Sequence, residues 1–221
     1  MSLLFDPARL PIAAALPLGG AFDIRALRVE EERSCDLPAR EALLDEAFGP
    51  ARLAKTSQRL RDGRIPAEGL ALVARDEDEL VATLRCWSVK AGDRPALLLG
   101  PLAVAKAHRS LGIGATMMRE ALWRAAACGH QAVILVGDAP YYARFGFEAS
   151  LTRELELPGP VDPARFLGFE IAPGALAGAK GMVRATGRAI PTRGRAKAAA
   201  WRRAGRRSNE AAATADIGAS L

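Results

Sequence analysis

The stretch Arg109-Ser110-Leu111-Gly112-Ile113-Gly114 decides the fold, because of the two segments that flank it. An apolar, strand-like run, residues 96–104, precedes it, and a segment with helical periodicity, about residues 115–128, follows it. A glycine-rich turn between a strand and a helix leaves backbone N–H groups unpaired, and the helix dipole adds positive potential there. Because Gly112 and Gly114 have no Cβ, an anion can approach the main chain closely. The stretch therefore predicts a site for a pyrophosphate.

Two other phosphate-binding motifs do not fit this turn. The dinucleotide fingerprint requires a third glycine, and Met117 occupies that position. The P-loop requires a lysine after its last glycine, and none follows Gly114. The six residues by themselves also fit a glycine-rich turn that binds nothing.

A second motif lies beyond the helix and makes the pattern more specific. Residues 131–136 form a β-branched run that is typical of a buried strand, and residues 137–147 follow with the sequence Gly-Asp-Ala-Pro-Tyr-Tyr-Ala-Arg-Phe-Gly-Phe. The Arg-x-x-Gly-x-Gly turn resembles the acetyl-CoA-binding signature of the GNAT N-acetyltransferases. The spacing from Tyr142 to Gly146-Phe147 is similar to the Tyr-x-x-x-Gly-Phe pattern of the same family. Together with Gly-Pro-Leu-Ala-Val before the turn, these motifs resemble a bacterial-type subgroup of predicted N-acetyltransferases.

The remaining segments predict an α/β (α+β) domain. Periodicity predicts further strands at 22–29, 69–75, 80–89, 152–157 and 166–171, and helices at 36–48 and 53–61. The resemblance implies the GNAT fold, in which a mixed, mostly antiparallel central sheet is flanked by helices. It also implies that two central strands splay apart and hold acyl-CoA between them.

The composition predicts three segments. Half of the 221 residues are hydrophobic, so one domain with a sizeable core is expected, at residues 22–185. Residues 1–21 are proline-interrupted and predict an irregular N-terminal extension. Residues 186–221 have little to bury and carry the whole net charge of +6, which predicts a largely disordered basic tail. Such a tail either contacts a polyanion weakly by charge or only solubilises the chain.

The cysteines argue against a disulfide framework and against a metal site. Cys35, Cys86 and Cys128 are odd in number and widely separated, so no metal ligand spacing is present. A reduced cytoplasmic setting follows, with buried and inert thiols at Cys86 and Cys128. No run of residues approaches the length of a membrane span.

The resemblance implies how the donor would bind. In the family, pantetheine contacts the backbone of the strand before the turn, which corresponds to Leu102, Ala103 and Val104, and the Val104 N–H is expected to donate to the acetyl oxygen. Arg109 is expected to lie near the CoA phosphates, although a solvated arginine explains it nearly as well. The N–H groups expected to bind the pyrophosphate are those of Leu111, Gly112, Ile113, Gly114 and Ala115.

Tyr142 is the predicted catalytic side chain, as the proton donor to the CoA thiolate. The alternative is an ordinary aromatic residue that packs beside Phe145 and Phe147, and Tyr141 is expected to point elsewhere. Many family members use a Glu on the strand before the turn as general base, but residues 96–104 contain no ionisable side chain. Asp138 and Ser88 remain as anchors for a water relay, and a helix cap explains Asp138 equally well.

We therefore predict an acetyl-CoA-dependent N-acetyltransferase (EC 2.3.1 type) that uses no metal, is a monomer or homodimer, and acts by direct attack of an amine. Two alternatives stay open: a transferase with a longer acyl-CoA or acyl-carrier donor, and a non-catalytic acyl-CoA-binding module with a basic interaction tail. Because no carboxylate base is found on the strand before the turn, the non-catalytic binding module remains an alternative. The acceptor pocket is expected within residues 36–69, whose sequence does not identify the acceptor.

Overall fold

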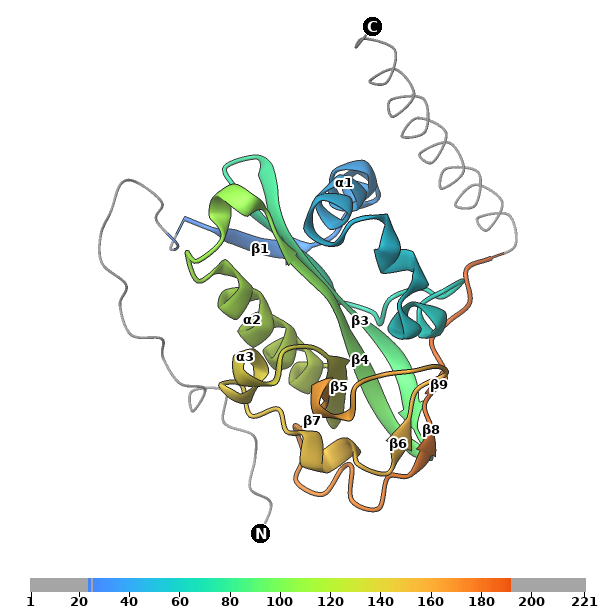
Figure 1. Cartoon of the computed structure of the whole chain (residues 1–221). Helices are drawn as coiled ribbons and strands as arrows, with labels where there is room; N and C mark the ends of the chain where they lie inside the picture. Colours follow the sequence, from blue (N-terminus) through green and yellow to red (C-terminus); the bar gives the residue numbers. More distant parts are fainter. Residues whose placement is uncertain (1–23, 25, 192–221) are drawn as a thin grey trace, which may run out of the picture.

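One sheet organises the chain (Figure 1). The computed structural model describes Ile24 and residues 26–191, so the predicted N-terminal extension and residues 192–221 lie outside the described part. The sheet has seven strands in the order β1-β2-β3-β4-β5-β7, with β9 paired to β3. Within this sheet of the described residues, β4 and β5 are the only parallel pair, so the predicted mixed, mostly antiparallel sheet is confirmed. The strands are β1 (Arg28–Glu31), β2 (Ala71–Asp76), β3 (Glu79–Ala91), β4 (Arg94–Val104), β5 (Ala132–Val136), β7 (Phe166–Glu170) and β9 (Arg184–Ala185).

Helices cover both faces of this sheet (Figure 1). On one face lie α1 (Leu37–Phe48) and the short 3-10 helices η3 (Pro50–Ala54) and η4 (Thr56–Leu60). On the other lie α2 (Ile113–Ala127) and α3 (Ala139–Ala143). The remaining elements are 3-10 helices η2 (Ser34–Asp36), η5 (Lys106–His108), η6 (Ala149–Thr152) and η7 (Pro163–Arg165), and a separate pair of strands, β6 (Leu155–Glu156) and β8 (Gly181–Met182).

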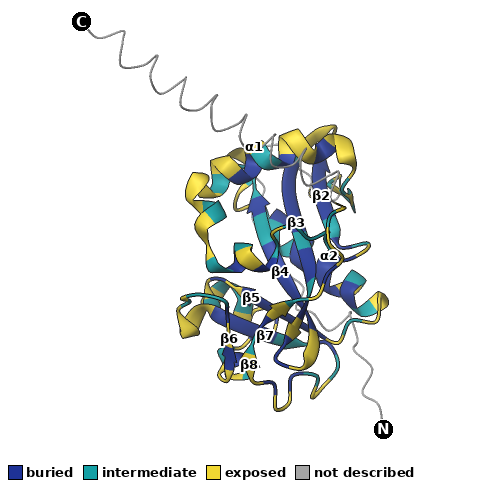
Figure 2. Ribbon diagram, turned by 90° about the vertical axis from the view of Figure 1, so that its right-hand side faces the viewer, coloured by how far each residue is buried: buried dark blue, intermediate teal, exposed yellow. Residues whose placement is uncertain are grey.

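The alternation of side chains along β4 separates two apolar cores. Leu97 and Leu99 are buried against α2, whereas Ala96 and Leu98 are buried in the cluster on the opposite face. Figure 2 shows this burial as dark blue along β3, β4 and β5. The inner face of α2 is apolar, and its side chains are nearly inaccessible to solvent. Those side chains are Met117, Met118, Ala121, Leu122 and Ala125.

Several predicted bounds are wrong for identifiable reasons. The first strand, predicted at 22–29, begins at Arg28, since Ile24, Ala26 and Leu27 lie outside its pairing with β2; residues 22, 23 and 25 are not among the described residues. The second predicted helix, 53–61, is two 3-10 turns, since Lys55 between them is extended. The predicted strand 152–157 does not join the main sheet, because Thr152 lies in η6 and its hydroxyl donates to the Phe166 carbonyl at 2.6 Å.

Two further predictions are corrected by burial and pairing. Cys86 is buried as expected, but Cys128 is exposed, because it caps the C-terminus of α2. The predicted boundary between domain and tail, at 185–186, falls inside a segment that is bonded to the sheet. The Thr186 N–H donates to the Ser88 carbonyl at 3.0 Å, and the Ile190 N–H donates to the Gly63 carbonyl at 2.9 Å. The packed part of the chain therefore extends at least to Ile190.

This pairing predicts different outcomes for two truncations. Deletion of residues 186–221 removes the bonds to Ser88 and Gly63 and should lower the free energy of unfolding by about 1–3 kcal/mol. Deletion of residues 192–221 removes none of these bonds and should change it by less than about 0.5 kcal/mol. Urea denaturation of both variants checks this. Equal stability of the two truncated chains would contradict the packing of residues 186–190.

Candidate active site

The parallel strands β4 and β5 separate soon after they meet. They pair at two positions, Leu97 with Val133 and Leu98 with Ile134. From there β4 continues beside β3 as far as Val104, whereas β5 ends at Val136. Residues 99–104 of β4 therefore face the end of β5 without a strand partner on that side, as far as the described chain extends. We call this opening the fork.

The main chain of β4 presents donors to the fork. The Ala105 N–H donates to the Val81 carbonyl at 2.8 Å, so Ala105 faces β3. Because main-chain groups alternate in direction along an antiparallel pair, Val104 and Leu102 face away from β3 and Ala103 faces toward it. In agreement, the Val104 carbonyl accepts from Nε of Arg109 at 3.2 Å. Of the three residues predicted from this strand, the N–H groups of Leu102 and Val104 are directed at the fork.

The predicted pyrophosphate turn forms the N-terminus of α2. Gly112, at φ +84°, is the N-cap residue and requires glycine, because this left-handed conformation is unfavourable for other side chains. No backbone hydrogen bond within the described chain engages the N–H groups of residues 111–114, so these donors are available. The Ala115 N–H was expected among them, but it donates to the Gly112 carbonyl at 3.0 Å. Four of the five predicted donors are therefore free for an anion.

Tyr142 lies at the end of β5 and packs its ring against Gly137. A Cβ at Gly137 would overlap this ring, so the close contact requires glycine. Burial, with smaller contributions from Tyr141 and Asp138, raises the pKa of Tyr142 to about 12, and Arg165 opposes this shift. The hydroxyl consequently keeps its proton throughout the neutral pH range.

Tyr141 points in a different direction from Tyr142, toward the predicted pyrophosphate turn. A Cβ added to Gly114 would lie 2.8 Å from the Tyr141 hydroxyl oxygen and 3.7 Å from Cγ2 of Val104. The ring also meets the Tyr142 ring at a centroid distance of 4.9 Å and lies under the Arg144 guanidinium. The two tyrosines therefore place one hydroxyl at the start of α2 and the other ring at the end of β5.

The candidates for a general base receive little support from their positions. Asp138 is the N-cap residue of α3, but its carboxylate makes no capping hydrogen bond. Ser88 lies opposite Leu97, on the part of β3 that is bonded to Thr186 and Gly187.

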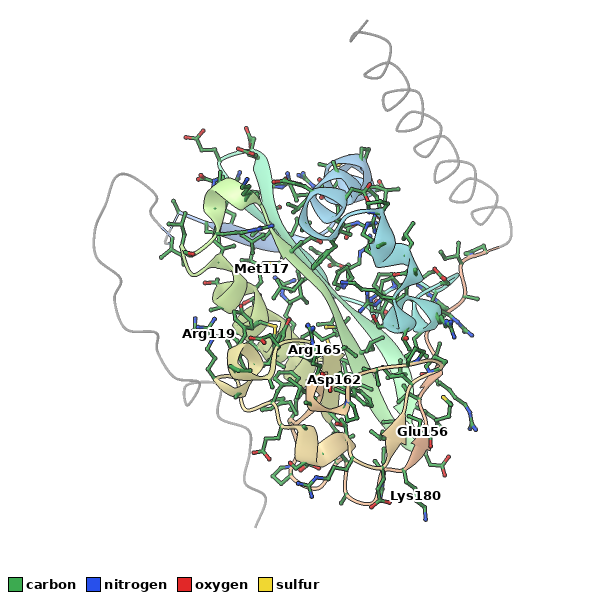
Figure 3. All side chains as sticks on the ribbon, in the orientation of Figure 1. Met117, Arg119, Glu156, Asp162, Arg165 and Lys180 are labelled. Atoms are coloured by element: carbon green, nitrogen blue, oxygen red, sulfur yellow. The ribbon has the colours of Figure 1, made fainter. Side chains whose placement is uncertain are left out.

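Sequence reasoning missed Arg165 at this site. Its backbone accepts from the Gly137 N–H at 2.9 Å, and its Nε donates to the Gly137 carbonyl at 3.3 Å. Figure 3 shows this residue beside the end of β5, whereas Met117 and Arg119 belong to α2. No local sequence signal marks Arg165, because its position depends on the pairing of β5 with β7.

The described residues contain neither a metal-binding cluster nor a candidate membrane helix. Among residues 26–191, no group of three or more His, Cys, Asp and Glu side chains is arranged to hold a metal ion. None of the helices in the same range combines the length and the apolar character that a membrane crossing requires.

The fork, the N–H groups at the start of α2 and the tyrosine-bearing helix α3 match the arrangement that the resemblance to the GNAT acetyltransferases implies. A family model described as an acetyltransferase (GNAT) domain matches residues 67–149. The chain is 31% identical over 159 residues to the uncharacterized N-acetyltransferase YhbS of Escherichia coli K12, covering 70% of this chain and 93% of that protein. The chain belongs to the GNAT family of N-acetyltransferases.

Solved structures agree with this assignment. The crystal structure of the GNAT family N-acetyltransferase YhbS from Escherichia coli in complex with CoA superposes with a TM-score of 0.62 at 29% identity, covering 72% of this chain and 89% of that chain. A GNAT family acetyltransferase from Brucella melitensis in complex with acetyl-CoA has a TM-score of 0.50 at 23% identity, covering 75% and 91%, and shares the fold.

The contact between Gly114 and Tyr141 makes the turn testable. In Gly114→Ala the new methyl group would displace the Tyr141 hydroxyl, so acetyl-CoA should bind roughly 5- to 10-fold more weakly, equivalent to about 1 kcal/mol. Replacing Tyr141 by Phe in the same chain removes the obstructing oxygen and should restore most of the affinity. Isothermal titration calorimetry with acetyl-CoA measures both variants.

Gly112→Ala is the matched control for this experiment. Its defect comes from the strained φ of +84°, so Tyr141→Phe should not repair it. Unchanged acetyl-CoA affinity in folded Gly112→Ala and Gly114→Ala would contradict the assignment of the turn.

Proposed function

We propose that the chain transfers an acetyl group from acetyl-CoA to the amine of an acceptor by direct attack, which is an EC 2.3.1 type of activity. The observation that carries this proposal is the fork with two inward-facing N–H groups, directly beside the free N–H groups at the start of α2. Similarity to proteins crystallised with CoA and with acetyl-CoA supports the same donor.

The donor would lie along β4 with its pyrophosphate at the turn. The N–H groups of residues 111–114 and the positive end of the α2 dipole favour an anion. Arg109 would add its remaining guanidinium N–H groups, since only its Nε is bound to the Val104 carbonyl. From the turn, pantetheine would reach the main chain of Val104 and Leu102, and the thioester would lie in the fork.

The proposed chemistry requires the enzyme to stabilise one oxyanion and one thiolate. Nitrogen of a neutral amine attacks the thioester carbonyl carbon, and the Val104 N–H stabilises the oxyanion that develops. When the C–S bond breaks, the Tyr142 hydroxyl gives its proton to the departing thiolate, and the nitrogen loses its extra proton to solvent. The raised pKa keeps the Tyr142 proton in place before this step.

A binding module without catalysis is the second candidate. It is favoured by one observation, that residues 94–104 of β4 carry no carboxylate that could accept the proton of the amine. Both candidates bind acyl-CoA at the fork, and only the enzyme releases free CoA thiol when amines are supplied. A longer acyl-CoA or acyl-carrier donor would be distinguished by comparing acyl chain lengths in the same assay.

Tyr142→Phe tests the proposed general acid. The substitution keeps the ring on Gly137 and removes only the hydroxyl, so acetyl-CoA affinity should be unchanged while kcat falls by roughly 10²- to 10⁴-fold. Thiol release with a pool of amines, or slow hydrolysis of acetyl-CoA, provides the rate. Tyr141→Phe is the control and should retain most of the activity. Full activity of Tyr142→Phe with a defective Tyr141→Phe would transfer the role to the other tyrosine.

A further inference from the structure

The guanidinium of Arg61 lies beside Gly100 of the fork, and no residue of the described chain forms a hydrogen bond or ion pair with it. A Cβ on Gly100 would be 3.1 Å from Nη2 of Arg61, and Gly100 follows the last residue pair of β4 with β5 by two positions. The residue keeps some exposed surface, but its Nε atom is fully enclosed and makes no hydrogen bond. Burial lowers the pKa of Arg61 to about 10, and the nearby Cys86 and Asp62 offset this only in part.

The lack of a partner distinguishes Arg61 from the other enclosed arginines of the described chain. Arg40 and Arg85 share the Glu32 carboxylate, and Arg75 is paired with Asp36. No ion pair or hydrogen bond is found for the Arg61 side chain among residues 26–191. A shielded guanidinium that lacks an anion is unfavourable, and a ligand that carries a negative charge would supply the missing partner.

Two more cations lie near this position. Burial, and then the charges of Arg165 and Arg61, lower the pKa of Lys55, so both arginines lie close enough to Lys55 for their charges to act on it. Arg165 is held at the end of β5 by its bonds to Gly137, and Lys55 links η3 to η4. Arg61 at Gly100 and Arg165 at Gly137 therefore place one positive charge beside each of the two strands that form the fork.

The 3-10 helix η4, which directly precedes Arg61, is hydrogen-bonded to the loop at Pro158 and Pro160. The Thr56 hydroxyl donates to the Pro160 carbonyl at 2.6 Å, and Arg59 donates to the Pro158 carbonyl. These bonds tie η4 to the loop that leads to Arg165. These hydrogen bonds help to hold the Arg61 guanidinium beside Gly100.

We propose that Arg61 binds the carboxylate of the acceptor, so that the acceptor is an amine that carries a carboxylate close to the reacting nitrogen. This inference rests on the proposed function and specifies its substrate class. The planar fork of a guanidinium matches a carboxylate with two parallel hydrogen bonds. Lys55 and Arg165 favour the same negative charge from a greater distance, whereas their like charges disfavour a cationic polyamine.

Matched acceptor pairs test this assignment. Thiol release is measured with acetyl-CoA and the common amino acids, each compared with its amino acid amide, which has the same amine but no carboxylate. Wild type should prefer the carboxylate by at least roughly 10-fold in kcat/KM. Arg61→Met should lower kcat/KM for the carboxylates by roughly 10- to 100-fold and leave the amides unchanged, with Arg61→Lys intermediate. Arg153→Met, at an exposed arginine, is the matched control.

Two readouts separate this role from a structural one and from failure of the proposed function. The melting temperature of Arg61→Met should not fall, because Met replaces an unpaired charge by apolar volume. In the presence of CoA, N-acetyl amino acids should stabilise wild type more than their amides do, and this difference should vanish in Arg61→Met. An equal loss of kcat/KM for the amino acids and their amides in Arg61→Met would overturn the assignment. Equal stabilisation of wild type by N-acetyl amino acids and by their amides would also overturn it. Failure of wild type to bind acetyl-CoA would instead contradict the proposed function.

Discussion

The short parallel pairing between β4 and β5 is the constraint on which the rest of the site depends. Two residue pairs join the strands, and beyond Leu98 each strand follows a different neighbour: β4 stays with β3, and β5 stays with β7. Unpaired main-chain groups at a sheet interior are unfavourable unless something else satisfies them. The N–H groups of Leu102 and Val104 can therefore donate hydrogen bonds to the carbonyl oxygens of a ligand, and the donors of residues 111–114 continue the same surface toward an anion.

Packing and function share residues around this fork. Leu97 and Leu99 are buried against α2, and this contact holds the start of α2 beside Val104. Trp87 donates to the Gly100 carbonyl at 2.8 Å, which fixes the main chain where the strands separate. Arg109 bonds the Val104 carbonyl and thereby connects the turn to the strand. These contacts therefore fix the geometry that we assign to acetyl-CoA, and we expect little reorganisation on binding.

The sequence predicted the elements of the site better than the directions of its groups. Glycine spacing and apolar periodicity identified the β4–turn–α2–β5 order, since both signals are local. The local sequence does not determine which N–H groups are unpaired. The Ala103 N–H faces β3 because of the strand register, and the Ala115 N–H donates to the Gly112 carbonyl. The sequence did not indicate that Tyr141 lies at Gly114, because this contact joins α3 to α2. Arg61 and Arg165 were missed, because their proximity to the fork arises from tertiary contacts that join η4 to the loop before β7.

The central claim is that acetyl-CoA binds along the fork and the turn. Amide hydrogen exchange, measured residue by residue with and without acetyl-CoA, tests it most directly. The account predicts slower exchange at Leu102, at Val104 and at residues 111–114, which have no acceptor in the free chain, and little change at Ala103 and Ala115, which already face one. Protection confined to other regions, such as the surface formed by η6 and β7, or protection at Ala103 and Ala115 without change at Leu102 and Val104, would contradict it.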